Sequence, residues 1–177
     1  MSESNTTSET SSPTLDTPFP SGGWKLYFHP AKETRWHMDT FKCIATMRTY
    51  RDLANIFAVL TPTDWARGKF FITPEDIPPL MENARNIRGG SYSIRIERAN
   101  VGPIMQKYII SAILGICLTT PGDLLSCVRI TPRRDFNILQ IWNRDCEKFN
   151  NPAGLLILDP KIPTSEIKYV PHVEKKI

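Results

Sequence analysis

The chain has 177 residues, a length that fits one domain with a sizeable hydrophobic core. Hydrophobic residues make up 41% of it and aromatic residues 10%, which predicts a packed globule and excludes a wholly disordered chain. The formal net charge is +4. The first twenty residues hold three of the 18 acidic residues and no lysine or arginine, so 22 basic and 15 acidic residues leave +7 on the rest. This balance favours an anionic partner, although an ordinary solvated surface explains it equally well.

The four cysteines predict neither a metal site nor a disulfide framework. None pairs at C-x-x-C spacing, and the three histidines do not cluster with them. The N-terminus is acidic and rich in Ser and Thr, without the features of a signal peptide or a mitochondrial presequence. The longest apolar stretch, YIISAILGICL, is too short to cross a bilayer as a helix. We therefore expect a cytoplasmic protein in a reducing compartment, with no metal and no cofactor.

The first third of the chain predicts a tail, two strands and a helix. Residues 1–22 are of low complexity and rich in Ser, Thr and Pro, so we expect a disordered tail followed by one domain over residues 23–177. Alternating hydrophobic residues predict strands at 24–29 (WKLYFH) and 41–47 (FKCIATM). Residues 49–60 (TYRDLANIFAVL) begin with a threonine N-cap and repeat hydrophobic residues at helical spacing, which predicts a helix.

The remainder alternates further strands with one more helix. Strand patterns occur at residues 69–73, 91–97, 124–131, 137–142, 154–159 and 165–170. Residues 103–118 form a helical pattern opened by Pro103, residues 144–149 predict one short helix, and residues 74–90 are a long proline-rich loop. Strands that pair on either side of two inserted helices are typical of an α+β fold with a largely antiparallel sheet.

An aromatic ring, a loop carboxylate and a basic hairpin are the parts needed to hold a purine nucleotide. Trp36 lies in a polar loop, where it is either a staple on the core or an exposed stacking plate. Glu82 can accept two hydrogen bonds, which matches the N1–H and N2–H₂ edge of guanine, and Arg133 and Arg134 offer donors for phosphate. Ordinary alternatives exist: Glu82 can simply be solvated, and the two arginines can belong to a charged turn. Trp142, in a later strand, can be a core residue.

The segments WKLYF (24–28), MENARNIRGGSY (81–92) and ILQIWNRDCE (138–147) stand out together. They resemble W-x-L-W-F, W-E-D-E-x-N-x-x-G-G-x-W and I-x-I-W-T-x-x-x-x-E of the eukaryotic translation initiation factor 4E family, which binds the 7-methylguanosine cap of messenger RNA. The likeness is strongest from about residue 24 to residue 142. It implies a curved, eight-stranded antiparallel sheet, two to three helices on its convex face, a cap slot on its concave side and a non-enzymatic role in translation initiation.

The resemblance also implies how the base would be held. Trp36 would stack on it, Glu82 and the backbone N–H of Met81 would read guanine, and Trp142 would touch the N7-methyl group. Met81 stands where the family has its second stacking tryptophan, but a thioether can still lie against a cationic ring, at about 0.3–1.5 kcal/mol for a sulfur–aromatic contact. Trp65 could lend a second aromatic surface, although a core role fits its surroundings better.

The phosphate site implied by the resemblance is reduced in this chain. Arg133 falls where the family has its phosphate-binding arginine, and Arg134 could substitute because the hairpin is about one residue longer. The family's next lysine is replaced by Ile138, and its arginine after the glycine pair is replaced by Ser91. Fewer cations predict weaker and less salt-sensitive binding of a triphosphate.

The surface that the family uses for partner proteins is altered as well. The tryptophan that grips the partner helix is replaced by Ala54, next to Tyr50, and two leucines are replaced by Lys107 and Ser111. The family's His-Pro-Leu ahead of the first strand is absent. Because such anchors carry most of an interface's energy, we expect a scaffold resembling initiation factor 4G, or a 4E-binding protein, to use a non-standard motif on a chain that is otherwise a monomer.

Two other classes of function can be weighed against cap binding. A pure interaction module or translational repressor would keep the fold, bind cap weakly or not at all, and act through the altered back surface. An enzyme is not supported, because no Ser/His/Asp or Cys/His order stands out and Cys127 lies in an apolar strand, where it fits the core.

Overall fold

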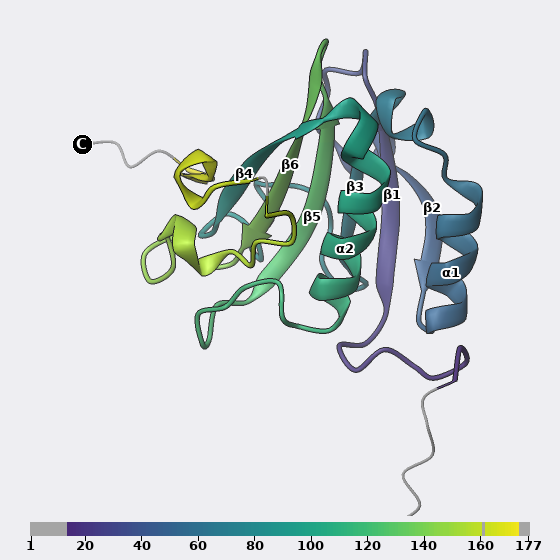
Figure 1. The fold of residues 1–177 in the computed structure, drawn as a ribbon, viewed down its shortest axis with the longest axis horizontal. Coiled ribbons are helices and arrows are strands. Elements are labelled where there is room, and N and C mark those ends of the chain that lie inside the picture. Colours follow the sequence, from purple (N-terminus) through teal and green to yellow (C-terminus); the bar gives the residue numbers. More distant parts are fainter. Residues whose placement is uncertain (1–13, 161, 174–177) are drawn as a thin grey trace, which may run out of the picture.

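The computed structural model describes residues 14–160 and 162–173, and over them the chain forms one sheet and two α-helices (Figure 1). The strands are Trp24–Pro30 (β1), Lys42–Met47 (β2), Gly68–Pro74 (β3), Gly90–Glu97 (β4), Leu125–Pro132 (β5), Phe136–Asn143 (β6) and Lys168–Pro171 (β7). The α-helices are Tyr50–Val59 (α1) and Val101–Ile113 (α2). Single turns of 3₁₀ helix lie at Met38–Thr40 (η1), Asp64–Ala66 (η2), Arg98–Asn100 (η3), Pro152–Gly154 (η4) and Thr164–Glu166 (η5).

The sheet has the order β2-β1-β3-β5-β6-β4-β7, and every pairing in it is antiparallel. The α+β prediction is confirmed, but the predicted eight strands are wrong by one. Residues 154–159 contribute only an isolated bridge between Leu118 and Leu155. Their backbone bonds elsewhere: the carbonyl of Leu156 accepts from Tyr108 of α2, and its N–H donates to the carbonyl of Cys117. Leu156 thus bonds to α2 and to the segment that follows α2, and not to a strand of the sheet.

Two local predictions also need correction. The predicted helix at 144–149 is a series of turns, in which the carboxylate of Asp145 accepts from the backbone N–H groups two and three residues on. The second helix begins at Val101, two residues ahead of Pro103, and ends at Ile113 rather than at residue 118. Gly115 then adopts a φ of +71°, a conformation that stops the helix and that a residue with a side chain rarely adopts.

The period-two pattern of the strands separates two hydrophobic clusters. Both helices cover the same face of the sheet (Figure 1), and the buried strand residues on that side include Trp24, Leu26, Phe70, Ile72, Ile94, Ile96, Val128, Ile130, Leu139 and Ile141. The opposite face carries a smaller, aromatic cluster of Tyr27, Phe41, Phe71, Cys127 and Trp142, with Leu80 and Met81 packed against it. Residues between the core positions therefore build a second surface, on which the candidate site lies.

The start of α1 is fixed by its cap and by the segment before β1. Thr49 and Asp52 form a capping box, in which each side chain accepts from the other residue's backbone N–H. Phe19 is buried against the ring of Tyr50, with centroids 5.3 Å apart, and Asp16 pairs with Arg51 at 2.5 Å. These contacts lie within the predicted tail, whose residues 1–13 lie outside the described residues. The division at residue 22 stays a prediction.

The cysteines and the helices of the described residues bear on two further expectations. All four cysteines are free, and Cys117 and Cys127 are buried. Neither α-helix in the described part of the chain is long and apolar enough to cross a membrane.

Candidate functional site

Trp36 is held in place by the loop that follows β1. The carboxylate of Glu33 accepts from the backbone N–H groups of Thr34 and Arg35 and from the guanidinium of Arg35, which lowers the pKa of Glu33 to about 2. One face of the indole lies on the ring of His29, with centroids 4.6 Å apart and planes 5° apart, yet Trp36 remains 39% exposed. Both interpretations of Trp36 therefore apply, because its indole packs on the buried ring of His29 and is still partly exposed to solvent.

The loop before β4 is shaped by the asparagine and the glycine pair of its motif. Asn86 is fully buried, and its side-chain amide donates to the carbonyls of Pro78 and Leu80 at 3.0 and 2.7 Å. Gly89 approaches Asn143 so closely that a Cβ would lie 1.8 Å from its carbonyl oxygen. A glycine is therefore needed for the loop to reach β6. Together these contacts carry the intervening residues to the aromatic face of the sheet.

Four of the predicted site residues meet at one cavity on that face. The cavity has a volume of about 270 Å³ and is lined by Trp36, Pro79, Met81, Glu82, Arg129 and Trp142. This is just under the roughly 300 Å³ at which small-ligand sites begin, a size for a base rather than a whole nucleotide. Met81 is half-buried on the aromatic cluster, Glu82 is exposed, and Trp142 is only 1% exposed, so little of its ring reaches solvent.

Trp142 is supported from behind by His172. The two rings meet edge to face, with centroids 4.9 Å apart and planes 69° apart. The Nδ1 of His172 lies 2.7 Å from the carbonyl oxygen of Asn86, so it must carry the proton, and Nε2 lies 3.0 Å from the hydroxyl of Ser91. Burial is the largest cause of the lowered pKa of His172. A neutral imidazole thus connects the loop, β4 and Trp142.

Arg129 lines this cavity, and Lys69 and Arg133 are two further cations close to it; Arg129 and Lys69 were not predicted. The guanidinium carbon of Arg129 lies 5.3 Å from the Trp36 centroid, and Nζ of Lys69 lies 4.7 Å from it. Burial lowers the pKa of both groups, and Arg133 lowers each further by repulsion. Among the described residues, none of these three side chains forms an ion pair. Glu82 lines the same cavity and Glu33 partly offsets the lowering of the Lys69 pKa, but three cations close together still favour an anionic ligand.

Arg133 and Arg134 lie in the turn between β5 and β6. Arg133 lowers the pKa of Lys69 and of Arg129 by repulsion, and its backbone carbonyl accepts from Arg98 at 2.6 Å. Arg133 and Arg134 are both exposed. Ile138 faces Thr131 across the sheet, an uncharged pair. A phosphate-binding role of either arginine stays a prediction.

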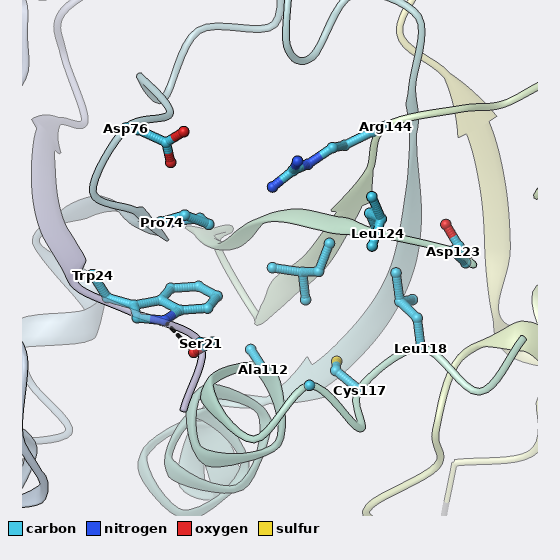
Figure 2. A pocket seen from close by; sticks show the side chains of 12 residues that line it. Ser21, Trp24, Pro74, Asp76, Ala112, Cys117, Leu118, Asp123, Leu124 and Arg144 are labelled. Atoms are coloured by element: carbon cyan, nitrogen blue, oxygen red, sulfur yellow. Dashed lines mark hydrogen bonds between the residues drawn. The ribbon is translucent and has the colours of Figure 1, made fainter. Parts of the chain in front are cut away.

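A second cavity, of about 260 Å³, lies between the end of α2 and the start of β1, with Trp24, Ala112 and Arg144 around it (Figure 2). Its tryptophan is committed to the core, since Trp24 is 2% exposed and donates to the hydroxyl of Ser21 at 2.9 Å. Its carboxylates are also engaged: Asp76 pairs with Arg85, and Asp123 accepts from Tyr92 and Asn143. This cavity offers no free aromatic plate and no free carboxylate for a base.

The four residues predicted for partner binding do not form one exposed surface. Ala54 is exposed on α1, whereas Tyr50 is partly covered by Phe19. On α2, Ser111 is 3% exposed and donates to the carbonyl of Tyr108, and Lys107 donates to the carbonyl of Leu158. Lys107 and Ser111 thus serve the helix and the C-terminal segment. Their predicted role in binding a partner stays a prediction, with little surface on Ser111 to support it.

The cations missed by sequence reasoning had a signal in the strand pattern. In KFFIT and SCVRIT, the core positions are Phe70, Ile72, Val128 and Ile130. Alternation therefore places Lys69 and Arg129 on the opposite face, with Phe71 and Cys127. A cation inside an otherwise apolar strand is therefore the signal in the sequence for this part of the site.

The sequence was compared with models of known protein families. The model of the family described as eukaryotic initiation factor 4E matches residues 21–173. The chain therefore belongs to the eukaryotic initiation factor 4E family, and the resemblance seen in its motifs is confirmed. No curated protein matches the sequence significantly.

Solved structures of the same family share the fold at low sequence identity. Initiation factor 4E-3 of C. elegans, in complex with the 4E-binding protein Mextli and a cap analogue, is 18% identical, with a TM-score of 0.68 over 88% of this chain and 92% of that one. Initiation factor 4E-3 of Ascaris suum with a 7-methylguanosine cap is 19% identical, with a TM-score of 0.66 over 92% and 95%. A schistosome initiation factor 4E with m7GpppA and a 4E-binding protein is 18% identical, with a TM-score of 0.64 over 75% and 74%.

Proposed function

We propose that this protein binds the 7-methylguanosine cap of messenger RNA and links capped RNA to a scaffold or 4E-binding protein in translation initiation. The observation that carries the proposal is the convergence of Trp36, Met81, Glu82 and Trp142 on one base-sized cavity. Family membership supports it, as do the cap ligands and binding proteins present in the related structures. The protein would act by recognition alone, without catalysis, in the cytoplasm.

The chemistry follows from the groups around the cavity. Trp36 supplies a stacking plate whose other face is already fixed by His29. Glu82 is exposed and can accept from N1–H and N2–H₂ of guanine, and Trp142, which lines the same cavity, would contact the methyl group. A methylated base carries a positive charge, which strengthens stacking by a cation–π contribution of about 0.5–2 kcal/mol. Arg133 and Lys69 would hold the phosphates.

A second candidate is an interaction module that binds partners and has a weak slot. Met81 favours it, because a thioether is a poorer plate than an indole, and so does Ala54, which leaves α1 without a large anchor. The two candidates differ in whether the isolated protein discriminates guanine.

Calorimetric titration of the purified protein with 7-methyl-GTP, GTP and ATP tests the proposal. We expect both guanine nucleotides to bind more tightly than ATP, and Trp36→Ala to weaken 7-methyl-GTP at least tenfold, about 1.4 kcal/mol. Met38 is a matched control, since it is 40% exposed in the same loop and does not line the cavity, so Met38→Ala should bind normally. Equal binding of ATP and 7-methyl-GTP, or no effect of Trp36→Ala, would favour the interaction module.

A further inference from the structure

The guanidinium of Arg129 lies inside the aromatic surroundings of the proposed base slot. Its central carbon is 5.0, 5.3 and 5.9 Å from the ring centroids of Phe71, Trp36 and Trp142, within the range of cation–π contacts. It also lines the cavity together with Glu82. The slot therefore already contains a fixed positive charge against two of the rings that would hold a methylated base.

This guanidinium lacks the partners that a buried charge normally has. Its Nε is buried without a hydrogen-bond partner, and among the described residues Arg129 forms no ion pair. Burial lowers its pKa to about 10, so the group still carries its charge at neutral pH. A buried donor of this kind calls for an acceptor from a ligand.

The register of the sheet places Arg129 beside the ring proposed to meet the methyl group. Cys127 pairs with Trp142 across β5 and β6, and Arg129 follows two residues later on the same face, opposite Gln140. A base that turns its N7 edge towards Trp142 would therefore bring N7 near Arg129. Unmethylated guanine offers acceptors at N7 and O6, for which arginine is the usual donor, whereas methylation removes the N7 acceptor and adds positive charge.

We propose that Arg129 reduces the preference of the slot for 7-methylated over unmethylated guanine, so that the protein accepts guanine caps of both kinds. The guanidinium donates to N7 of the unmethylated base and repels the positive charge of the methylated one. Glu82 and Trp36 favour the methylated base, and Arg129 opposes them. The inference rests on the proposed function, because it concerns the same slot.

The test is the ratio of the dissociation constants of GTP and 7-methyl-GTP, measured by calorimetry on the full chain. Arg129→Met keeps much of the side-chain length and removes both the charge and the donors. We expect this variant to bind GTP more weakly and 7-methyl-GTP more tightly than the wild type, so that the ratio rises at least tenfold. Arg133→Met is the control, because loss of a phosphate ligand should weaken both nucleotides by the same factor.

Each other result overturns the inference. Equal weakening of both nucleotides by Arg129→Met would make Arg129 a phosphate ligand, and unchanged binding would give it no role. If the wild type binds both guanine nucleotides but the ratio does not move, only this inference fails. If the wild type binds neither, the proposed function fails with it. Thermal unfolding verifies that Arg129→Met is folded, and Arg129→Gln provides the same comparison with a polar side chain should it not be.

Discussion

The ring of His29 lies parallel to that of Trp36, 4.6 Å away between centroids, and is itself fully buried. Its Nε2 contacts the carbonyl of Arg35 at 3.0 Å, so one residue fixes both the loop and the indole. A plate that is already ordered costs less conformational entropy on binding. His29 thus holds the ring of Trp36 in place before a ligand binds.

Replacing His29 should therefore weaken nucleotide binding without touching the ligand. Aromatic pairs contribute about 0.5–1.5 kcal/mol beyond burial, so we expect His29→Ala to weaken 7-methyl-GTP about twofold to tenfold. His29→Phe restores a ring at the same place and should recover most of the affinity. Calorimetry gives the affinities, and acrylamide quenching of tryptophan fluorescence reports the mobility of Trp36. Similar affinities for His29→Ala and His29→Phe would contradict a role for stacking.

Met81 offers a base a poorer stacking surface than Trp36 does, so Met81→Trp should strengthen the binding of 7-methyl-GTP. Met81 is half-buried against the aromatic cluster and lines the cavity, so an indole there can reach the base. We expect 7-methyl-GTP to bind about threefold to tenfold more tightly, as an added aromatic contact implies. Ile87, 39% exposed in the same loop and away from the cavity, provides the control Ile87→Trp. An equal gain from both substitutions would indicate a general effect of a surface tryptophan.

The strands were predictable because alternation in the sequence matches the two faces of the sheet. Leu26 and Phe28 face the helices, and Tyr27 between them belongs to the aromatic cluster. Residues 154–159 were predicted as a strand from their apolar side chains. Such a pattern does not show whether the backbone N–H and C=O groups are free to pair with a neighbouring strand. The carbonyls of Leu156 and Leu158 bond to side chains of α2, which no local pattern reveals.

For the site, the resemblance brought Trp36, Met81, Glu82 and Trp142 to attention, and the structure gathers them at one cavity. Their roles towards a nucleotide stay a proposal. The contribution of His29 could not be predicted, since a histidine in a strand gives no sign of the loop residue that will pack on it. Long-range contacts of this kind depend on how the loop after β1 folds back.

Lys69 should act on the phosphates and not on the base. Its pKa is lowered by burial and then by Arg129 and Arg133, a repulsion that a bound phosphate would relieve. We expect Lys69→Met to weaken 7-methyl-GTP about fivefold, about 1 kcal/mol, and to leave 7-methylguanosine, which lacks phosphate, nearly unchanged. Lys25→Met is the comparison, because Lys69 lies over the ring of Trp36 at 4.7 Å, whereas Lys25 lies at the other end of the β1–β3 pairing, opposite Thr73. Equal losses for the nucleotide and the nucleoside would assign Lys69 to the base.

The back surface should accept a large anchor at Ala54. This residue is exposed on α1, so an indole can project into solvent without displacing the core. A helical peptide from a 4E-binding protein should bind the wild type weakly, and Ala54→Trp should raise its affinity at least tenfold, because aromatic anchors dominate such interfaces. Fluorescence anisotropy of the labelled peptide measures this. Ala58→Trp, one turn further along α1 and also exposed, should not reproduce the gain.

His172 should make the stability of the fold depend on pH below about 6.5. Its folded-state pKa lies below the ordinary 6.5, because burial and Arg129 outweigh the opposing effects of Asn86 and Glu82. Between the two pKa values the unfolded chain binds more protons than the folded one, so the free energy of unfolding falls as the pH falls through this window. Protonation would also remove the acceptor at Nε2 that faces the Ser91 hydroxyl.

Thermal unfolding between pH 7.5 and pH 5 (roughly the range in which histidine titrates) measures this dependence. His172→Phe keeps a ring against Trp142 but cannot titrate, so its melting temperature should fall less steeply with acid than that of the wild type, although it starts lower because two hydrogen bonds are lost. His37 is exposed in the loop of Trp36, and His37→Phe should retain the wild-type slope. If His172→Phe and the wild type lose stability in parallel, the acid sensitivity arises elsewhere and His172 only supports Trp142.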